Sequence, residues 1–219
     1  MWKQIRSWFG GGEAADKPAN EFDAIKSEVE QILRLDLAAE SAREAHDEAV
    51  FAVIKRLDAA IEQVRQQADG YPEKPISAAV WMNGVGYANL ACALTQHFKQ
   101  AGWLKREENA SVLWAKATLA VCSHYHHMVG PAMLANADCH DRLGNTERAT
   151  EMYSGVVKDF AFLVEGYLAD DDPPTDDSRA ALESLRTAID RLLSRGNSER
   201  GGIDLNLLQA QTESVLLRT

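Results

Sequence analysis

Apolar residues recur at three- and four-residue steps along most of this chain, a period typical of helices that bury one face. The first such series consists of Phe22, Ile25, Val29, Ile32 and Leu33. Comparable series continue toward the C-terminus, and we find no credible strand. The pattern therefore predicts an all-α fold of about seven or eight helices.

Glycine, proline and capping residues divide the chain into the expected helices. The first is expected to begin with Asn20 as its N-cap. It either continues as one long helix to about residue 67 or breaks near Ser41, where Ser41 and Glu44 form a capping-box pattern. Gly84 and Gly86, inside the next helix, are expected to permit close approach of a neighbour. The further helices are expected at 76–101, 109–129, 132–143, 146–168, 178–195 and 203–217.

The composition fits one globular domain. The chain has 219 residues, of which 46% are hydrophobic and 26% charged, enough for a sizeable core. A net charge of −10 argues against nucleic-acid binding, which needs clustered Lys and Arg. Three cysteines in apolar helical contexts indicate a reduced compartment, so we expect a cytoplasmic protein. No apolar run approaches the ~18 residues of a transmembrane helix. The expected organisation is a flexible tail, a single helical domain, and a linker with a last helix, at residues 1–19, 20–195 and 196–219.

The N-terminal tail carries an apolar pattern of its own. Trp2, Trp8 and Phe9 fall at roughly helical spacing before a run of three glycines that stops any helix. This pattern predicts a weak contact with a membrane or a partner. The alternative is an apolar terminus that packs on its own domain or stays disordered.

Small residues, a glycine and an aromatic residue are spaced through residues 131–161 as in a helical hairpin. Ala137 precedes an expected turn at Gly144, and Ala149 and Tyr153 follow that turn. Small residues let two helices approach, and glycine takes the left-handed conformation of the turn. The segment resembles a tetratricopeptide repeat. The resemblance implies an α-α superhelix of such hairpins, with an irregular helical bundle as the alternative.

A second, degenerate copy of the repeat covers residues 84–120. Leu90 and Ala91 suit the first helix of the repeat, and Trp114 suits the second. Gly102, however, comes about one helical turn later than the family's turn glycine.

In this family the first helix of each hairpin lines a groove that holds a peptide or a partner helix. The resemblance therefore implies a non-enzymatic interaction scaffold. It implies these groove-facing residues: Leu134, Asp138, Asp141 and Arg142 from the first copy, and Cys92, Thr95 and Gln96 from the degenerate one. Their polar and acidic character favours a basic or mixed peptide. No Gly-x-Ser-x-Gly or other catalytic signature occurs, so we expect no catalytic residues and no cofactor.

Cysteine and histidine residues gather in the second half of the chain. Cys122 and His126 are four residues apart and share a helix face. A turn at residues 130–131 is expected to fold the next helix back and bring Cys139 and His140 level with them. Such a set can bind Zn²⁺ tetrahedrally, so a metal- or haem-binding protein is the alternative function. Against it, the adjacent Cys139 and His140 point about 100° apart on a helix, and both residue types also pack in helical cores.

Overall fold

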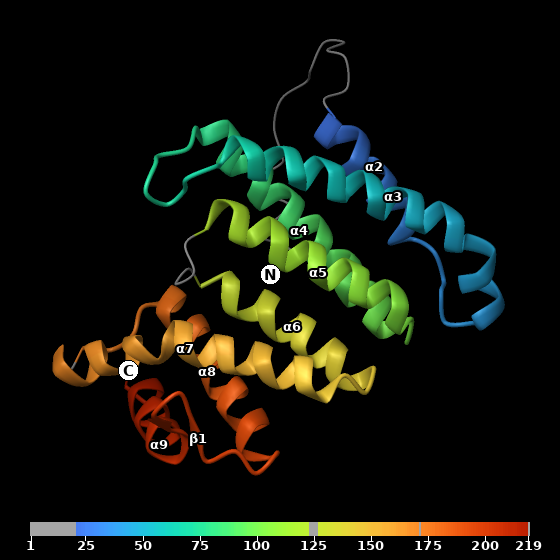
Figure 1. Ribbon diagram of the computed structural model, residues 1–219. Coiled ribbons are helices and arrows are strands. Elements are labelled where there is room, and N and C mark those ends of the chain that lie inside the picture. The colour runs from blue at the N-terminus through green and yellow to red at the C-terminus, as the bar shows by residue number, and fades with distance from the viewer. Residues whose placement is uncertain (1–20, 123–126, 171, 219) are drawn as a thin grey trace.

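The computed structural model describes residues 21–122, 127–170 and 172–218 (Figure 1). These residues form eight helices and one short pair of strands, which confirms the all-α fold class. The elements are α2 (Glu21–Ile32), α3 (Glu40–Gln67), α4 (Ala78–Gln100), α5 (Leu104–Val121), α6 (Val129–Arg142), α7 (Thr146–Asp170), α8 (Asp176–Leu193), β1 (Glu199–Arg200), β2 (Ile203–Asp204) and α9 (Leu205–Leu216).

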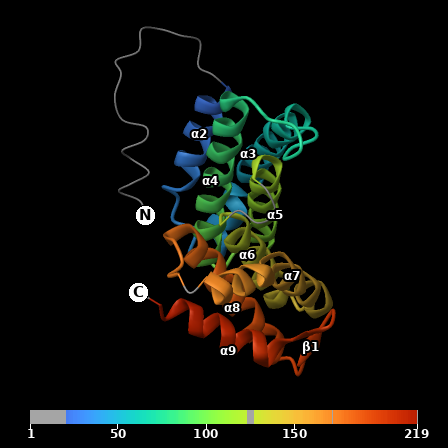
Figure 2. The same ribbon diagram turned by 90° about the vertical axis from the view of Figure 1, so that its left-hand side faces the viewer.

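The helices pack as hairpins that follow one another in chain order. α4 packs against α5, α6 against α7, and α8 against α9. Successive hairpins meet where α5 contacts α6 and where α7 contacts α8. α2 lies against α4 and α3 against α5, so this pair covers the first hairpin. Figures 1 and 2 show the resulting order, from α2 and α3 at one end of the molecule to α8 and α9 at the other.

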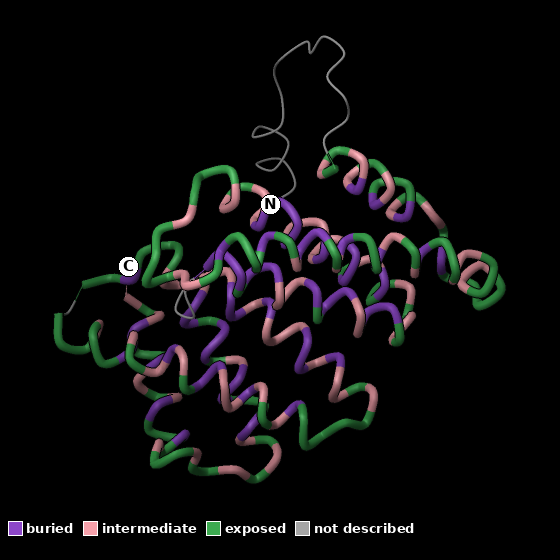
Figure 3. The backbone as a smooth tube through the Cα atoms, turned by 45° about the horizontal axis from the view of Figure 1, so that its top comes forward, coloured by how far each residue is buried: buried purple, intermediate pink, exposed green. Residues whose placement is uncertain are grey.

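The core is continuous between these hairpins. Buried residues lie on the helix faces that turn toward one another (Figure 3). Phe98, Tyr153 and Phe160 are among the largest fully buried side chains. In α8, Leu182, Leu185, Ile189 and Leu192 are buried, at the spacing that predicted this helix.

The two glycines of α4 allow the close approach expected from the sequence. A Cβ atom at Gly84 would overlap the side chain of Val121 at the end of α5. A Cβ atom at Gly86 would lie 2.6 Å from Cε2 of Phe22 on α2. Because glycine has no side chain, α5 and α2 can both pack directly on the α4 backbone.

The N-terminal helical region is broken, as one of the two alternatives predicts, but not by the expected cap. Ala39 holds the N-cap position of α3 and makes no side-chain cap bond, so the capping box predicted at Ser41 is wrong. Arg43 instead fixes this connection, because its Nη1 donates to the carbonyl of Ala38 at 3.1 Å and to that of Ala101 at 2.8 Å. The N-cap expected at Asn20 lies outside the described residues.

The boundary between α5 and α6 also differs from the prediction. α5 begins before Asn109, whose side chain accepts a bond from Arg106 at 3.1 Å inside the helix. α5 ends at Val121, and α6 already contains Gly130 and Pro131. The helix stop predicted at Gly130 is wrong because α5 ends at Val121, whereas the helix start predicted beside it lies close to the observed start of α6 at Val129. Pro131 fits in this first turn because a proline there has no intrahelical N–H bond to lose.

A short pair of strands occurs where the sequence predicted a polar linker. β1 and β2 pair antiparallel, with Glu199 opposite Asp204. Gly201 and Gly202 connect them, with φ values of 59° and 82°. Two successive positive φ angles are what a type I′ hairpin turn requires, and glycine adopts them without strain. The strands lie directly before α9, which packs on α7 and α8.

Candidate functional site

A groove of about 1040 Å³ runs between α7 and the β1–β2 hairpin. We call it the α7 groove. One wall is a single face of α7, and the other is the hairpin with its glycine turn. The lining residues are Thr146, Glu147, Thr150, Glu151, Ser154, Val157 and Lys158 from α7, and Arg200, Gly201 and Ile203 from the hairpin.

The part of the α7 wall between Thr146 and Ser154 presents hydrogen-bond acceptors, whereas Val157 and Lys158 add an apolar group and a cation farther along it. Thr150 donates its hydroxyl proton to the carbonyl of Thr146, and Ser154 donates to that of Thr150, each at 2.8 Å. Because these protons are already used, both hydroxyls offer oxygen lone pairs to the groove. Glu147 and Glu151 add carboxylate oxygens to the same face. This part of the groove therefore suits a ligand that donates hydrogen bonds.

The hairpin wall offers a donor. Nη2 of Arg200 donates to Oδ1 of Asn197 at 2.7 Å, whereas its buried Nε has no hydrogen-bond partner among the described residues. A buried N–H group without an acceptor costs about 1–3 kcal/mol.

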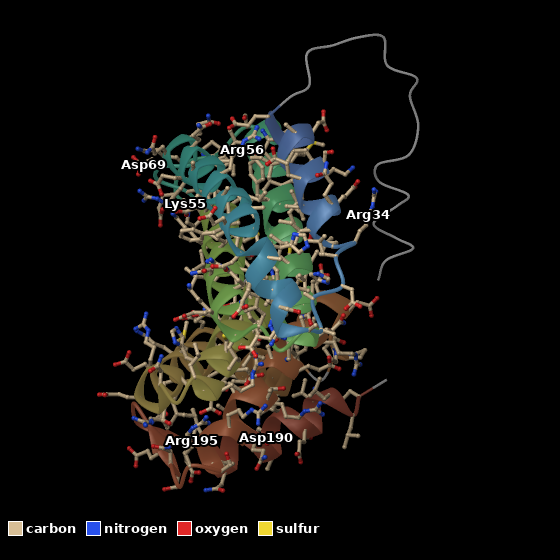
Figure 4. The ribbon with its side chains drawn as sticks, turned by 90° about the vertical axis from the view of Figure 1, so that its right-hand side faces the viewer. Arg34, Lys55, Arg56, Asp69, Asp190 and Arg195 are labelled. Atoms are coloured by element: carbon tan, nitrogen blue, oxygen red, sulfur yellow. The ribbon has the colours of Figure 1, made fainter. Side chains whose placement is uncertain are left out.

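Arg195 connects the hairpin wall to the helices beneath it. Its Nη2 lies 2.6 Å from Oδ1 of Asp141 on α6, and its guanidinium carbon lies 4.8 Å from the centre of the Tyr153 ring on α7. Asn197 donates to the carbonyl of Leu192 at the end of α8, at 3.2 Å. These contacts tie the segment between α8 and β1 to α6, α7 and α8. Figure 4 places Arg195 at the α8 end of the molecule, far from Arg56 on α3.

Asp138 joins the same three helices. It accepts a hydrogen bond from the phenol of Tyr153 at 2.5 Å, and it lies 3.3 Å from Nε of Arg191 on α8. Burial raises the pKa of Tyr153, and the bond to Asp138 raises this pKa further. The phenol is therefore protonated at neutral pH and acts here as a donor.

The groove-facing residues predicted on α6 thus make contacts within the protein. Asp138 and Asp141 take part in the ion pairs above, and Arg142 pairs with the buried Glu107 of α5. Leu134 is partly buried against the core. The residues that line the α7 groove are different ones, so the partner-binding role of these four residues stays a prediction.

The three groove-facing residues predicted on α4 differ in burial. Thr95 is 1% exposed and donates to the carbonyl of Ala91 at 2.8 Å, so its prediction as a groove-facing residue is wrong. Cys92 is half-buried and Gln96 is exposed. The partner-binding role of these two residues stays a prediction.

Among the predicted metal ligands that the structure describes, Cys122 and Cys139 do not come together. Cys122 follows the last residue of α5, whereas Sγ of Cys139 lies 3.8 Å from the carbonyl of Leu104 at the first residue of α5. An 18-residue helix is about 27 Å long, so the expectation that Cys122 and Cys139 lie level is wrong. His140 lies 3.8 Å from Glu108, and His126 is outside the described residues.

The chemistry of the thiols agrees with this separation. Burial raises the pKa of Cys122 and that of Cys139 to about 11, which keeps both thiols protonated. Over the residues that the structure describes, no three His, Cys, Asp or Glu side chains could hold a metal ion.

The predicted membrane contact falls on Trp2, Trp8 and Phe9, which lie outside the described residues. Within the part of the chain that is described, no helix has the length and apolar character to cross a membrane.

No protein-family model matches this chain, and no curated protein or solved structure matches it. The resemblance to a tetratricopeptide repeat therefore stays a prediction. Individual features of it are present, because Gly144 has a φ of 80° between α6 and α7, and Ala137, Ala149 and Tyr153 are buried.

Sequence reasoning missed the α7 groove for an identifiable reason. Thr146, Thr150 and Ser154 recur at four-residue steps and mark one polar helix face. Such a face is usually only a solvated surface. The Gly201-Gly202 pair signals a hairpin, but nothing in the sequence indicates that this hairpin lies opposite the polar face of α7.

Proposed function

We propose that this chain is a non-enzymatic, cytoplasmic interaction scaffold that holds a partner peptide in the α7 groove. The observation that carries the proposal is the groove itself, whose α7 wall presents oxygen acceptors along one helix face. A groove on a rigid helical frame offers a peptide a preformed site, which lowers the entropic cost of binding.

The carboxylates at one part of the groove favour a peptide with a Lys or Arg side chain there, while Lys158 and Arg200 line other parts of it. Glu147 and Glu151 supply carboxylates, while an extended peptide backbone supplies N–H donors for the hydroxyl oxygens of the wall. The net charge of −10 favours the approach of a basic segment at low salt.

Selection of random peptides on the full chain tests this proposal. Selected peptides are expected to be enriched in Lys and Arg, and fluorescence anisotropy then gives their dissociation constants. Glu147→Gln removes one carboxylate from the groove and is expected to weaken binding about tenfold, the effect of losing one charged hydrogen bond.

Glu165→Gln is the matched control, since Glu165 is exposed on α7 and is not among the groove lining. It removes the same charge from the same helix and is expected to leave the dissociation constant unchanged. Selected peptides without basic residues, or equal effects of the two substitutions, would contradict the proposal.

A further inference from the structure

Helix α4 and its flanks carry no Asp, Glu, Lys or Arg from Ile76 to Phe98, in a chain where 26% of residues are charged. Burial accounts for part of this. One side of α4 packs on α5 through Gly84, and another packs on α2 through Gly86. A third side, from Met82 to Gln96, is half-buried to exposed among the described residues, and it lacks charge as well.

The open side of α4 is an uncharged stripe. Met82 is 66% exposed, Gln96 is exposed, and the residues between them on this side are half-buried. Their spacing of three and four residues places them on one helix face. We call the set the α4 stripe: Met82, Val85, Asn89, Cys92, Ala93 and Gln96.

The α4 stripe shares with interface cores its lack of charge and an exposed methionine. Such cores are depleted in charged residues and enriched in methionine. Methionine also adapts its shape to a partner because its side chain is flexible. The exposed Met82 and the half-buried Val85 give the α4 stripe an apolar part that another apolar segment can cover.

We propose that the N-terminal segment of the same chain, residues 2–9, docks on the α4 stripe. The apolar residues Trp2, Ile5, Trp8 and Phe9 fall at roughly helical spacing, so one side of this segment can cover an apolar helix face. The apolar side of residues 2–9 thus matches the uncharged, partly apolar surface of the α4 stripe.

The covalent connection brings the two together. The described chain starts at Glu21, and the neighbouring Phe22 packs against Gly86 of α4. Residues 10–20 can span at most about 36–40 Å, while α4 with its 23 residues is about 34 Å long. Every position of the α4 stripe is therefore within reach. A short linker also gives the segment an effective concentration of about millimolar, so weak docking suffices.

Charge favours the chain's own surface over an anionic membrane. Residues 1–9 contain Lys3 and Arg6 and no acidic residue, so they carry +2. Since the whole chain carries −10, the remaining residues carry −12. Glu21 and Asp23 lie in the first turn of α2, next to α4. The body of the protein attracts the basic segment, whereas anionic lipid repels that body.

Photo-crosslinking in the full chain tests the docking. Ile5 is replaced by p-benzoylphenylalanine, which keeps an apolar side chain at this position, and mass spectrometry locates the crosslinks. We expect crosslinks to peptides from 78–100 in monomeric protein. A probe at Gly11, outside the apolar pattern, is expected to give fewer of them. Crosslinks that map elsewhere, or that appear only in covalent dimers, would overturn the proposal.

A second test introduces a charge into the α4 stripe. Met82→Glu places a carboxylate at a 66% exposed position, so folding is preserved. It is expected to lower the α4 crosslink yield about tenfold, because an apolar contact would have to bury the charge. Leu207→Glu, at another exposed apolar residue, is the matched control and should leave the yield unchanged. Equal yields in all variants would refute the docking.

A last arm separates docking from lipid binding. Vesicles of phosphatidylserine and phosphatidylcholine are added, and flotation is measured together with the crosslinks. The α4 crosslinks are expected to persist. Their loss, with flotation of the protein, would overturn the proposal in favour of a membrane anchor. Because the α7 groove is a different surface, Met82→Glu should not alter peptide binding there, and the two proposals can fail separately.

Discussion

Arg195 lies 2.6 Å from the carboxylate of Asp141, and this pair ties the segment before β1 to α6. The Arg195 side chain is mostly buried, so its loss leaves a charged partner without its main contact. The pair fixes one wall of the α7 groove, and it links the stability of the C-terminal hairpin to the shape of the proposed binding site.

Arg195→Met removes this ion pair while keeping an unbranched apolar side chain. We expect the free energy of unfolding to fall by about 1–3 kcal/mol, the range for a hydrogen bond to a charged group. Chemical denaturation measures it. Arg148→Met is the control, since Arg148 and Glu151 form an exposed pair that contributes about 0–1 kcal/mol. Similar losses in both variants would argue against an anchoring role for Arg195.

Gly84→Ala and Gly166→Ala are expected to change stability in opposite directions. A methyl group at Gly84 overlaps Val121, so overpacking should cost about 1–3 kcal/mol. Gly166 lies inside α7 with nothing within 4 Å of an added Cβ. Alanine there should stabilise the helix by about 0.5–1 kcal/mol. Thermal and chemical unfolding of both variants test the close packing of α4 on α5, which a gain in stability from Gly84→Ala would disprove.

His97 is expected to make the protein less stable in acid. Burial lowers its pKa, while a hydrogen bond to the backbone carbonyl of Ile32 partly opposes this shift. An unfolded histidine titrates near pH 6.5. Below that pH the unfolded state binds more protons, so the stabilisation present above pH 6.5 is lost as pH falls through the folded pKa.

His97→Asn removes this titration and keeps a side-chain donor for Ile32. The difference in unfolding free energy between wild type and this variant is expected to shrink from about pH 7.5 to about pH 5. Denaturation at several pH values measures it. If the difference in unfolding free energy stays constant or grows in acid, His97 is not the group whose titration lowers the stability.

The three thiols are expected to react slowly with alkylating reagents. Burial raises the pKa of Cys92, Cys122 and Cys139 to about 11 each, from an ordinary value of 9.0. A rise of two units lowers the thiolate fraction about 100-fold. Iodoacetamide labelling of native and urea-unfolded protein, followed by mass spectrometry, should show a rate difference of about that size. A fast-reacting Cys122 or Cys139 in the native protein would contradict the burial described here.

The helices could be predicted because their signals are local. Apolar spacing located most of the helical segments, and Gly84 and Gly86 correctly indicated close packing of α4. The start of α3 could not be predicted from Ser41, because Arg43 fixes the connection through the carbonyl of Ala101, which is remote in sequence. The start of α5 was misplaced for a similar reason, since Asn109 bonds to Arg106 within the helix and does not cap it.

The candidate site was less predictable. Cys122 and Cys139 are predicted to lie level across a turn, yet the length of α5 separates them. Cys122 follows the last residue of α5, and α6 runs back along α5, so Cys139 lies beside its first residue. Asp138 and Asp141 are predicted to face a ligand. Instead, Asp138 pairs with Arg191 on α8, and Asp141 pairs with Arg195, which follows α8. Ion pairs between distant segments depend on how whole helices pack, and a motif confined to one hairpin carries no information about them.

The sequence by itself determined that this chain is helical, where most of its helices lie, and that Gly144 closes a turn between two of them. Periodic burial and backbone conformation are properties of neighbouring residues, so a local pattern is enough to specify them. The tertiary structure alone decided that the β1–β2 hairpin faces α7 and that one side of α4 stays open. Both follow from the stacking of hairpins in space, which brings together residues with no relationship along the chain.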